Sequence, residues 1–385
     1  MPTTEQYSHR DIPGLHIPEK EVIEDLASYI KLFSTGKLKN YYFRGEPTNY
    51  RETISSALRG KGLHAYLDME RDFHEEYPFF HMKREFKREV WYKLSGDERM
   101  HFSAFSQHHG IPTNLIDITS SPLVALYFAC QKFDYPENDG ENLEKNRGFV
   151  YLIEDSFVDI TNILSKFEDD NILELLAYNK RNIFIDMYNL FLDFKKMNPQ
   201  KFNQYLYELT EEYHVYFRNI ASEQHIPKET VPKGTFYEIV YHSYVHKIIE
   251  HNQKLKQIYN QIEDVCEEVF LYLAILQSFL KNVLDGTEHV YWFNKIMPMF
   301  KYAPILSFDR GRNQQGLFIY QTYLNYIAGI IKTPMLPRQR IWSDKIIVIN
   351  NKEKILEELD FMGINEKFIY GDYDHIASYI RNKRR

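Results

Sequence analysis

The chain has 385 residues, of which 44% are hydrophobic and 26% are charged, and this balance excludes a disordered or collagen-like chain. Its 47 Lys and Arg residues and 54 Asp and Glu residues give a formal net charge of −7. A global attraction to nucleic acid or to an anionic membrane is therefore not expected, although a local basic site is compatible with this charge.

The first stretch of the chain alternates between helical and strand-like patterns. Short aromatic or apolar runs predict strands, and apolar residues spaced by three and four predict helices. Ser121 followed by Pro122 predicts a helix start, because Ser is a favourable N-cap and Pro suits the first helical position. In chain order we expect a helix over 21–33, a strand over 41–43, a helix within 70–94, a strand over 115–118, a helix over 122–130 and a strand over 149–153.

The middle stretch, residues 159–297, has an almost entirely helical pattern. Its clearest segment runs from Leu255 to Leu280, where apolar residues lie on one helical stripe. Residues 184–194 have similar spacing, and Pro199 is expected to end a helix. No catalytic or binding motif is recognisable here, so the stretch is compatible with structural filler, a lid or a partner-binding bundle.

The mixed pattern returns near Pro298 and completes the chain. Residues 316–320 and 346–349 predict strands, and residues 352–359 predict a helix that Gly363 closes. We therefore expect an α+β protein in which a small mixed or antiparallel sheet domain is interrupted by an all-helical insertion. The expected units are a helical N-terminal lead-in (1–37), the first part of the domain (38–158), the insertion (159–297) and the second part of the domain (298–385).

The two cysteines and the apolar runs bear on the compartment. Cys130 and Cys266 lie in apolar helical patterns, and we interpret both as small buried hydrophobic residues. Residues 1–10 lack the apolar segment of a secretory signal. The longest apolar run, 269–280, is well short of the ~20 residues that span a bilayer. We expect a cytoplasmic protein without a membrane partner.

The first candidate cluster is Arg44-Gly45-Glu46, at the end of a predicted strand. A guanidinium there can bind two phosphate oxygens, and the glycine allows a ligand to approach the backbone. The alternative is a structural arginine that pairs with Glu46.

The second candidate cluster contains His108, His109 and Asp117. The histidines could serve as a general base, a metal ligand or a platform under a ring. Their spacing matches no familiar zinc pattern, so no metal is predicted. In the structural alternative, His109-Gly110 caps a helix and Asp117 fixes a turn.

The third candidate cluster is a donor-rich segment just before the predicted strand at 316–320. Arg310, Arg312, Gln314 and Gln315 lie in this segment next to glycines. They could contact phosphate or a base edge. The alternative is a solvated loop.

Several sequence blocks resemble the FRG domain family, which is named for its Phe-Arg-Gly motif. They are YFRGE at 42–46, QHHGIPTNLID at 107–117, SPLVALYFA at 121–129 and NQQGLF at 313–318, and the resemblance covers residues 38–155 and 304–379. It implies a bacterial or phage protein in a setting of mobile-element defence or toxin-like genes, and hence a toxin-like or anti-phage effector. It implies no particular reaction.

The order of elements is also similar to that of ADP-ribosyltransferase-like domains. This similarity implies that NAD is the substrate and that a polar segment and a late strand complete the site. The implied roles are pyrophosphate binding by Arg44, contact with nicotinamide by His108 or His109, bracing of the ribose by Ser120 or Ser121 and its orientation by Gln315. The sequence departs from the pattern at the late strand, where Gln314-Gln315 replaces Glu-x-Glu.

Two other functions are compatible with the sequence. In the first, the protein is a non-catalytic module that binds a nucleotide or nucleic acid, with Arg44, Arg310 and Arg312 on phosphates and aromatic rings stacked on bases. In the second, it is a sensor whose helical insertion binds a protein partner. We place the ADP-ribosyltransferase-like or NAD-cleaving function before these two.

Overall fold

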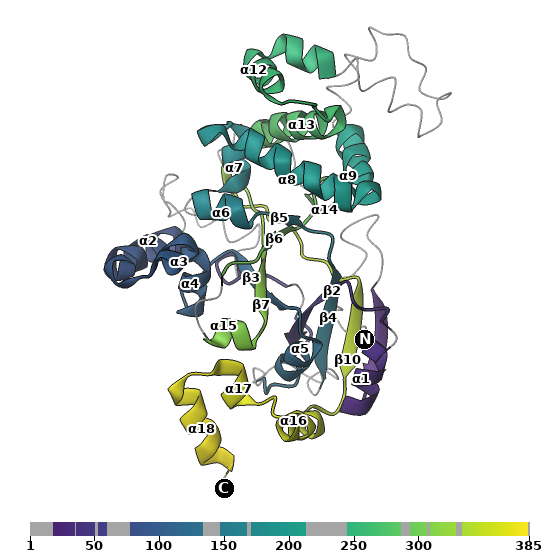
Figure 1. Cartoon of the computed structure of the whole chain (residues 1–385), viewed down its shortest axis with the longest axis vertical. Helices are drawn as coiled ribbons and strands as arrows, with labels where there is room; N and C mark the ends of the chain where they lie inside the picture. Colours follow the sequence, from purple (N-terminus) through teal and green to yellow (C-terminus); the bar gives the residue numbers. More distant parts are fainter. Residues whose placement is uncertain are drawn as a thin grey trace.

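The computed structural model describes residues 18–34, 36–50, 53–59, 78–133, 147–167, 171–212, 245–285, 293–305, 309–328 and 333–383. A mixed sheet lies in the middle of the molecule, with a helical region at one end and the C-terminal helices at the other (Figure 1). Its strands, in spatial order, are β1 (Glu19–Ile23), β10 (Lys345–Ile349), β4 (Gly148–Glu154), β2 (Tyr41–Glu46), β3 (Leu115–Thr119), β7 (Gly316–Tyr320), β6 (Phe300–Tyr302) and β5 (Val158–Asp159).

The sheet is antiparallel except at its two edges. β1 pairs in parallel with β10, and β5 pairs in parallel with β6. All other neighbouring strands run antiparallel. A separate two-stranded sheet joins β8 (Tyr326–Ala328) and β9 (Thr333–Met335). The fold is thus a mixture of helices and one eight-stranded mixed sheet, which is larger than the small sheet that we expected.

The N-terminal lead-in differs from the expected helix over 21–33. Residues 19–23 form β1, and helix α1 (Leu26–Ser34) begins only after it. Asp25 Oδ1 accepts a hydrogen bond from the Ser28 N–H at 2.7 Å, as expected of a residue that caps a helix. Only Ile23 of the strand is buried, so this edge strand carries little apolar signal, and the helical spacing that begins at Val22 concealed it.

Helix α5 (Pro122–Ala129) packs closely on one face of the sheet. Ser121 Oγ accepts a hydrogen bond from the Val124 N–H, which confirms the predicted helix start. A Cβ atom on Gly45 would lie 1.8 Å from the Ala125 carbonyl oxygen, and one on Gly148 would lie 2.1 Å from the Ala129 carbonyl oxygen. Both glycines are therefore required for this close approach of helix and sheet.

A second group of helices lies on the other side of β3 and β7. Two of them, α4 and α15, come from distant parts of the sequence but lie beside β3 and β7, while α2 and α3 pack on α4 (Figure 1). The bounds are α2 (Pro78–Val90), α3 (Gly96–Met100), α4 (Phe102–His108) and α15 (Asp309–Asn313).

The helical insertion begins after β5 and ends before β6, so its two ends meet at one edge of the sheet. Its described helices are α6 (Thr161–Phe167), α7 (Ile172–Ala177), α8 (Ile183–Met197), α9 (Pro199–Glu212), α12 (Gln253–Gln261), α13 (Glu267–Leu284) and α14 (Phe293–Ile296). One hydrophobic cluster contains both insertion residues, such as Phe191, and the β7 residues Phe318 and Tyr320. The insertion therefore shares its core with the sheet.

The apolar stripe from Leu255 to Leu280 is divided between two helices. The chain leaves the helical path between α12 and α13, where Asp264 has a φ of +49°. Cys266 stands at the N-cap of α13 and is only half-buried, whereas Cys130 is buried, and both thiols are free. Among the helices of the described ranges, none is both long and apolar enough to cross a membrane.

The C-terminal helices are α16 (Lys352–Phe361), α17 (Glu366–Tyr370) and α18 (Tyr373–Lys383). α16 confirms the predicted helix over 352–359, and Gly363 follows its end with a φ of +86°. α17 packs against α15 through hydrogen bonds from Asn313 to the Phe368 carbonyl and from Gln314 to the Ile369 carbonyl. Helix α17 thus contacts the segment that carries the third candidate cluster.

Candidate functional site

The sheet opens between β2 and β3. β2 pairs with β4 along all six of its residues, but it pairs with β3 only at Phe43 and Thr119. A pocket of about 290 Å³ lies at this opening and receives residues from β2, α4, β3, α5, α15 and β7. Elements that are distant in sequence therefore meet at one concave site, which is typical of a ligand pocket.

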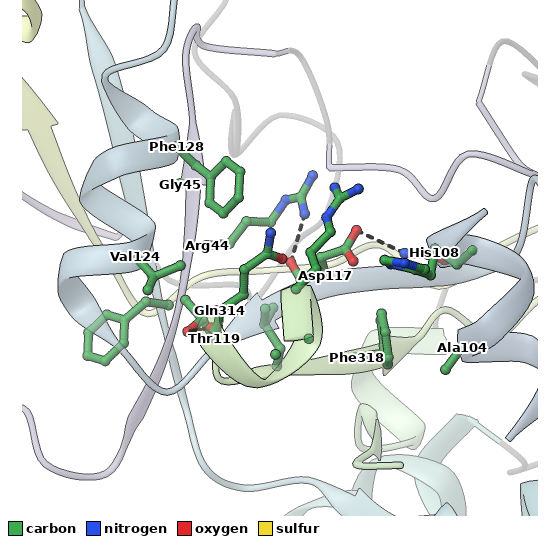
Figure 2. Close-up of a pocket in the computed structure, with 16 residues that line it drawn as sticks. Arg44, Gly45, Ala104, His108, Asp117, Thr119, Val124, Phe128, Gln314 and Phe318 are labelled. Carbon is green, nitrogen blue, oxygen red and sulfur yellow. Dashed lines mark hydrogen bonds between the residues drawn. The ribbon is translucent and has the colours of Figure 1, made fainter. Parts of the chain in front are cut away.

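Arg44 reaches across the opening. Its Nη1 donates to the Asp117 backbone carbonyl at 2.7 Å (Figure 2), and its Nε donates to Glu46 Oε1 at 2.8 Å. Glu46 is only 2% exposed and also accepts a hydrogen bond from Thr53 Oγ1. The ion pair that was the structural alternative is therefore present, but Arg44 also lines the pocket.

Glu46 and Gly45 are placed differently from what a ligand-binding role requires. The Glu46 carboxylate is buried and does not line the pocket. Gly45 does line it, but the position of its missing side chain is occupied by the backbone of α5. This glycine is explained by helix packing rather than by the approach of a ligand.

Arg310 provides a second cation from a distant segment. It belongs to α15, lines the pocket, and has its guanidinium 5.0 Å from the centre of the Tyr370 ring. Stacking of this kind holds a guanidinium in place without neutralising its charge. Arg312, in the same helix, is exposed and does not line the pocket.

The two histidines have different surroundings, although they are neighbours at the end of α4 and their ring centres lie only 4.9 Å apart. His108 ends α4 and lines the pocket, whereas His109 caps the helix and packs against the Phe105 ring at 4.4 Å between ring centres. Gly110 follows with a φ of +82°. The predicted cap at His109-Gly110 is confirmed, and only His108 faces the site.

Burial controls the charge of His108. It lowers the pKa of His108 to about 4, and the nearby positive charges of His109 and Arg310 act in the same direction, while Asp372 opposes them. Burial also lowers the pKa of His109. His108 is therefore a neutral imidazole at pH 7, able to accept a proton or a hydrogen bond but not to attract an anion.

Asp117 lies in the middle of β3 and not in a turn. Its carboxylate is exposed in the pocket, where Oδ2 accepts a hydrogen bond from Gln107 Nε2 at 2.8 Å. Gln107 Oε1 in turn accepts from Thr113 Oγ1. The predicted role of Asp117 in a turn is wrong. The residue instead supplies a carboxylate to the pocket, and the hydrogen bond from Gln107 fixes its orientation.

The remaining polar candidates divide between the pocket and its edge. Gln314 lines the pocket, and its carbonyl accepts from Thr119 Oγ1 at 2.6 Å. Gln315 does not line the pocket and has a φ of +46°, and its Oε1 accepts from Ser120 Oγ. Ser121 is occupied as the N-cap of α5. Of these four residues only Gln314 is positioned to touch a ligand.

The apolar walls were not among the sequence candidates. They include the rings of Phe43, Phe128 and Phe318 together with Val124. In β2, Phe43 directly precedes Arg44, and Phe128 lies on the α5 helix that covers the strand. The sequence shows an aromatic residue next to the arginine, but its place in the pocket wall depends on the opening between β2 and β3, which the sequence does not reveal.

A second pocket of about 220 Å³ adjoins the first. The two share Arg44, Gln107 and Asp117, and the second is also lined by Arg59, Ser55 and other residues. Within the described ranges, no group of three or more His, Cys, Asp or Glu residues could hold a metal ion. Chemically, the larger pocket offers two guanidinium groups, one carboxylate, a neutral imidazole and aromatic walls, and Arg59 adds a third guanidinium in the smaller pocket.

Comparison with known proteins agrees with the motifs in this site. Residues 39–138 match the model of the FRG domain, and this match includes Arg44, His108 and Asp117. No curated protein and no solved structure is significantly similar to the chain. The chain therefore carries an FRG domain, whose Phe-Arg-Gly strand and double-histidine segment build two sides of the pocket.

Proposed function

We propose that the two adjoining pockets bind a dinucleotide, and that this dinucleotide is NAD. The observation that carries the proposal is the position of Arg44 in the wall that both pockets share. A dinucleotide consists of two nucleoside halves joined by a pyrophosphate. With one half in each pocket, the pyrophosphate lies at this guanidinium, which binds phosphate oxygens well.

The two pockets offer different surroundings to the two halves. The larger pocket, with Phe128, Phe318 and His108, suits the flat nicotinamide ring and its ribose. The smaller pocket, with Arg59 and Ser55, suits the adenosine half. Arg310 adds a second cation on the side of the larger pocket, so the site is attractive to a dianionic pyrophosphate.

The proposed reaction is cleavage of the bond between nicotinamide and ribose. The bonding electron pair leaves with the nicotinamide nitrogen, and the ribose carbon becomes an oxocarbenium ion that the Asp117 carboxylate stabilises by its charge. The oxygen of water, or of an acceptor, then bonds to that carbon, and its proton passes to neutral His108. With water, NAD gives nicotinamide, ADP-ribose and one proton. In the setting of defence or toxin-like genes, this consumption of NAD acts as the effector step.

Incubation of the purified protein with NAD, followed by chromatography for free nicotinamide, tests the proposal. Arg310→Gln is the diagnostic variant, and Arg312→Gln is its matched control, since both change the same helix by the same charge. We expect Arg310→Gln to weaken the binding of NAD and ADP-ribose by roughly tenfold or more, because a charge-assisted hydrogen bond is lost. Arg312→Gln is expected to bind like the wild type.

A nucleotide-binding module without turnover is the second candidate. It is favoured by Gln314, a neutral residue that lines the pocket and belongs to the segment in which the transferase resemblance implies Glu-x-Glu. Binding of NAD that depends on Arg310 but yields no nicotinamide, with water or with a cell extract as acceptor, supports this candidate. Absence of both binding and turnover contradicts both functions.

A further inference from the structure

The C-terminal helix α18 carries an exposed apolar face. Tyr373 is 92% exposed and Ile380 is 50% exposed, and none of the residues of the helix is buried. An isolated helix of 11 residues is only marginally stable in water, because helix stability comes mainly from packing of an apolar face. The outer face of α18 contributes no such packing within the part of the chain that the structure describes.

The opposite face of α18 is attached to the rest of the chain. The His375 ring stacks on the Tyr370 ring at 4.0 Å between centres, and Asp372 Oδ1 accepts from the His375 N–H. Tyr379 and Lys383 donate to the Asp360 carboxylate of α16. These contacts fix the orientation of the helix, so that Tyr373, Ala377 and Ile380 form its outer face at helical spacing.

Two opposite charges flank this face, a negative one near the beginning of α18 and a positive one near its end. Asp374 follows Tyr373 at the beginning of α18, and Arg381 follows Ile380 at its end, and both are exposed. Neither side chain pairs with another residue in the ranges that the structure describes. If two such helices lie antiparallel, Asp374 of each faces Arg381 of the other, and Tyr373 of each packs near Ile380 of the other.

We propose that α18 pairs with α18 of a second copy of this chain, antiparallel, about a twofold axis near Ala377. A twofold axis brings the same patch of both copies together, and only a self-complementary charge order fits it. One helix pair is small for an interface, so the dimer is weak and reversible.

Sedimentation of the full chain over a wide range of concentrations tests the proposal. We expect a reversible monomer–dimer equilibrium in the wild type. Ile380→Glu is expected to abolish the dimer, whereas Ile30→Glu, a matched change of an exposed isoleucine on α1, leaves it unchanged. Circular dichroism of each variant, compared with that of the wild type, verifies that the substitution has not unfolded the rest of the protein.

Charge reversal makes the test specific to the antiparallel arrangement. Asp374→Arg alone and Arg381→Asp alone each place like charges opposite one another, and each is expected to weaken the dimer by about tenfold or more. The double variant restores opposite charges and is expected to recover most of the affinity. A wild-type protein that is monomeric at all concentrations overturns the proposal. So does a dimer that survives Ile380→Glu, or a double variant as weak as the singles.

Discussion

Arg44 contacts both the interior of the protein and the pocket. Its Nε pairs with buried Glu46, and its Nη1 holds the carbonyl of Asp117 across the open seam of the sheet. Removal of the arginine would take away the positive charge that pairs with the buried Glu46 carboxylate, and loss of one member of a buried ion pair strongly destabilises a fold. A loss of activity on changing Arg44 therefore does not distinguish a ligand contact from an architectural one, whereas Arg310 permits that distinction.

His108 gives a pH prediction at the same scale. Its pKa falls from 6.5 to about 4 on folding, so the unfolded chain takes up the proton first as the pH is lowered. Stability from the neutral imidazole is present above pH ~6.5 and is lost as the pH falls towards about 4. In His108→Gln we expect a smaller fall in melting temperature between about pH 7 and about pH 5 than in the wild type.

The comparison for His108 is an exposed histidine. His81 on α2 is exposed, and His81→Gln is expected to keep the wild-type pH dependence. Burial also lowers the pKa of His101 and His109, so a part of the slope remains in His108→Gln. Identical slopes in the wild type and His108→Gln, from differential scanning fluorimetry, would show that His108 is not the buried neutral group described here.

At the scale of elements, the contact between β2 and α5 yields a stability prediction. Gly45→Ala places a Cβ 1.8 Å from the Ala125 carbonyl oxygen, and the helix must move to accommodate it. We expect a loss of about 3 kcal/mol or more in the free energy of unfolding, measured by urea denaturation. Gly96→Ala is the control, because its Cβ would meet no atom within 4 Å, and a change within about 1 kcal/mol is expected.

Elements with strong local signals were predictable from the sequence. β7 has the predicted bounds, β4 and β10 extend the predicted strands by a residue or two, and α5 begins at the predicted cap. Edge strand β1 was missed because only Ile23 in it is buried. The break between α12 and α13 was missed because Asp264 adopts a positive φ, a backbone conformation that periodicity does not reveal.

The candidate site was predictable as a set of segments but not as a set of side chains. The three clusters do meet at one pocket, through Arg44, His108, Asp117, Arg310 and Gln314. Which neighbour in each pair faces the pocket depends on local backbone geometry. The end of α4 selects His108 over His109, and the turn at Gln315 directs that side chain to Ser120.

At the scale of the whole molecule, the helical insertion is part of a common core with the sheet. Phe191 of α8 contacts Phe300 of β6, with ring centres 6.4 Å apart, and Tyr302 contacts Phe318 of β7. These residues belong to one continuous hydrophobic cluster. The insertion therefore packs into the core of the sheet even though its ends meet at the paired strands β5 and β6, and a partner-binding role would be added to this structural one.

The common core predicts that the sheet and the insertion unfold together. Excision of residues 160–298 would expose the rings of Phe300, Tyr302 and Phe318, and we expect the product to aggregate. A milder change is more informative, because Phe191→Ala leaves the chain intact and should cost about 3–5 kcal/mol. Calorimetry of the wild type is expected to show one unfolding transition for the sheet and the insertion together. In Phe191→Ala this single transition is expected to move to lower temperature. Two transitions, of which only one moves, would mean that the insertion is an independent domain whose removal leaves the pocket intact.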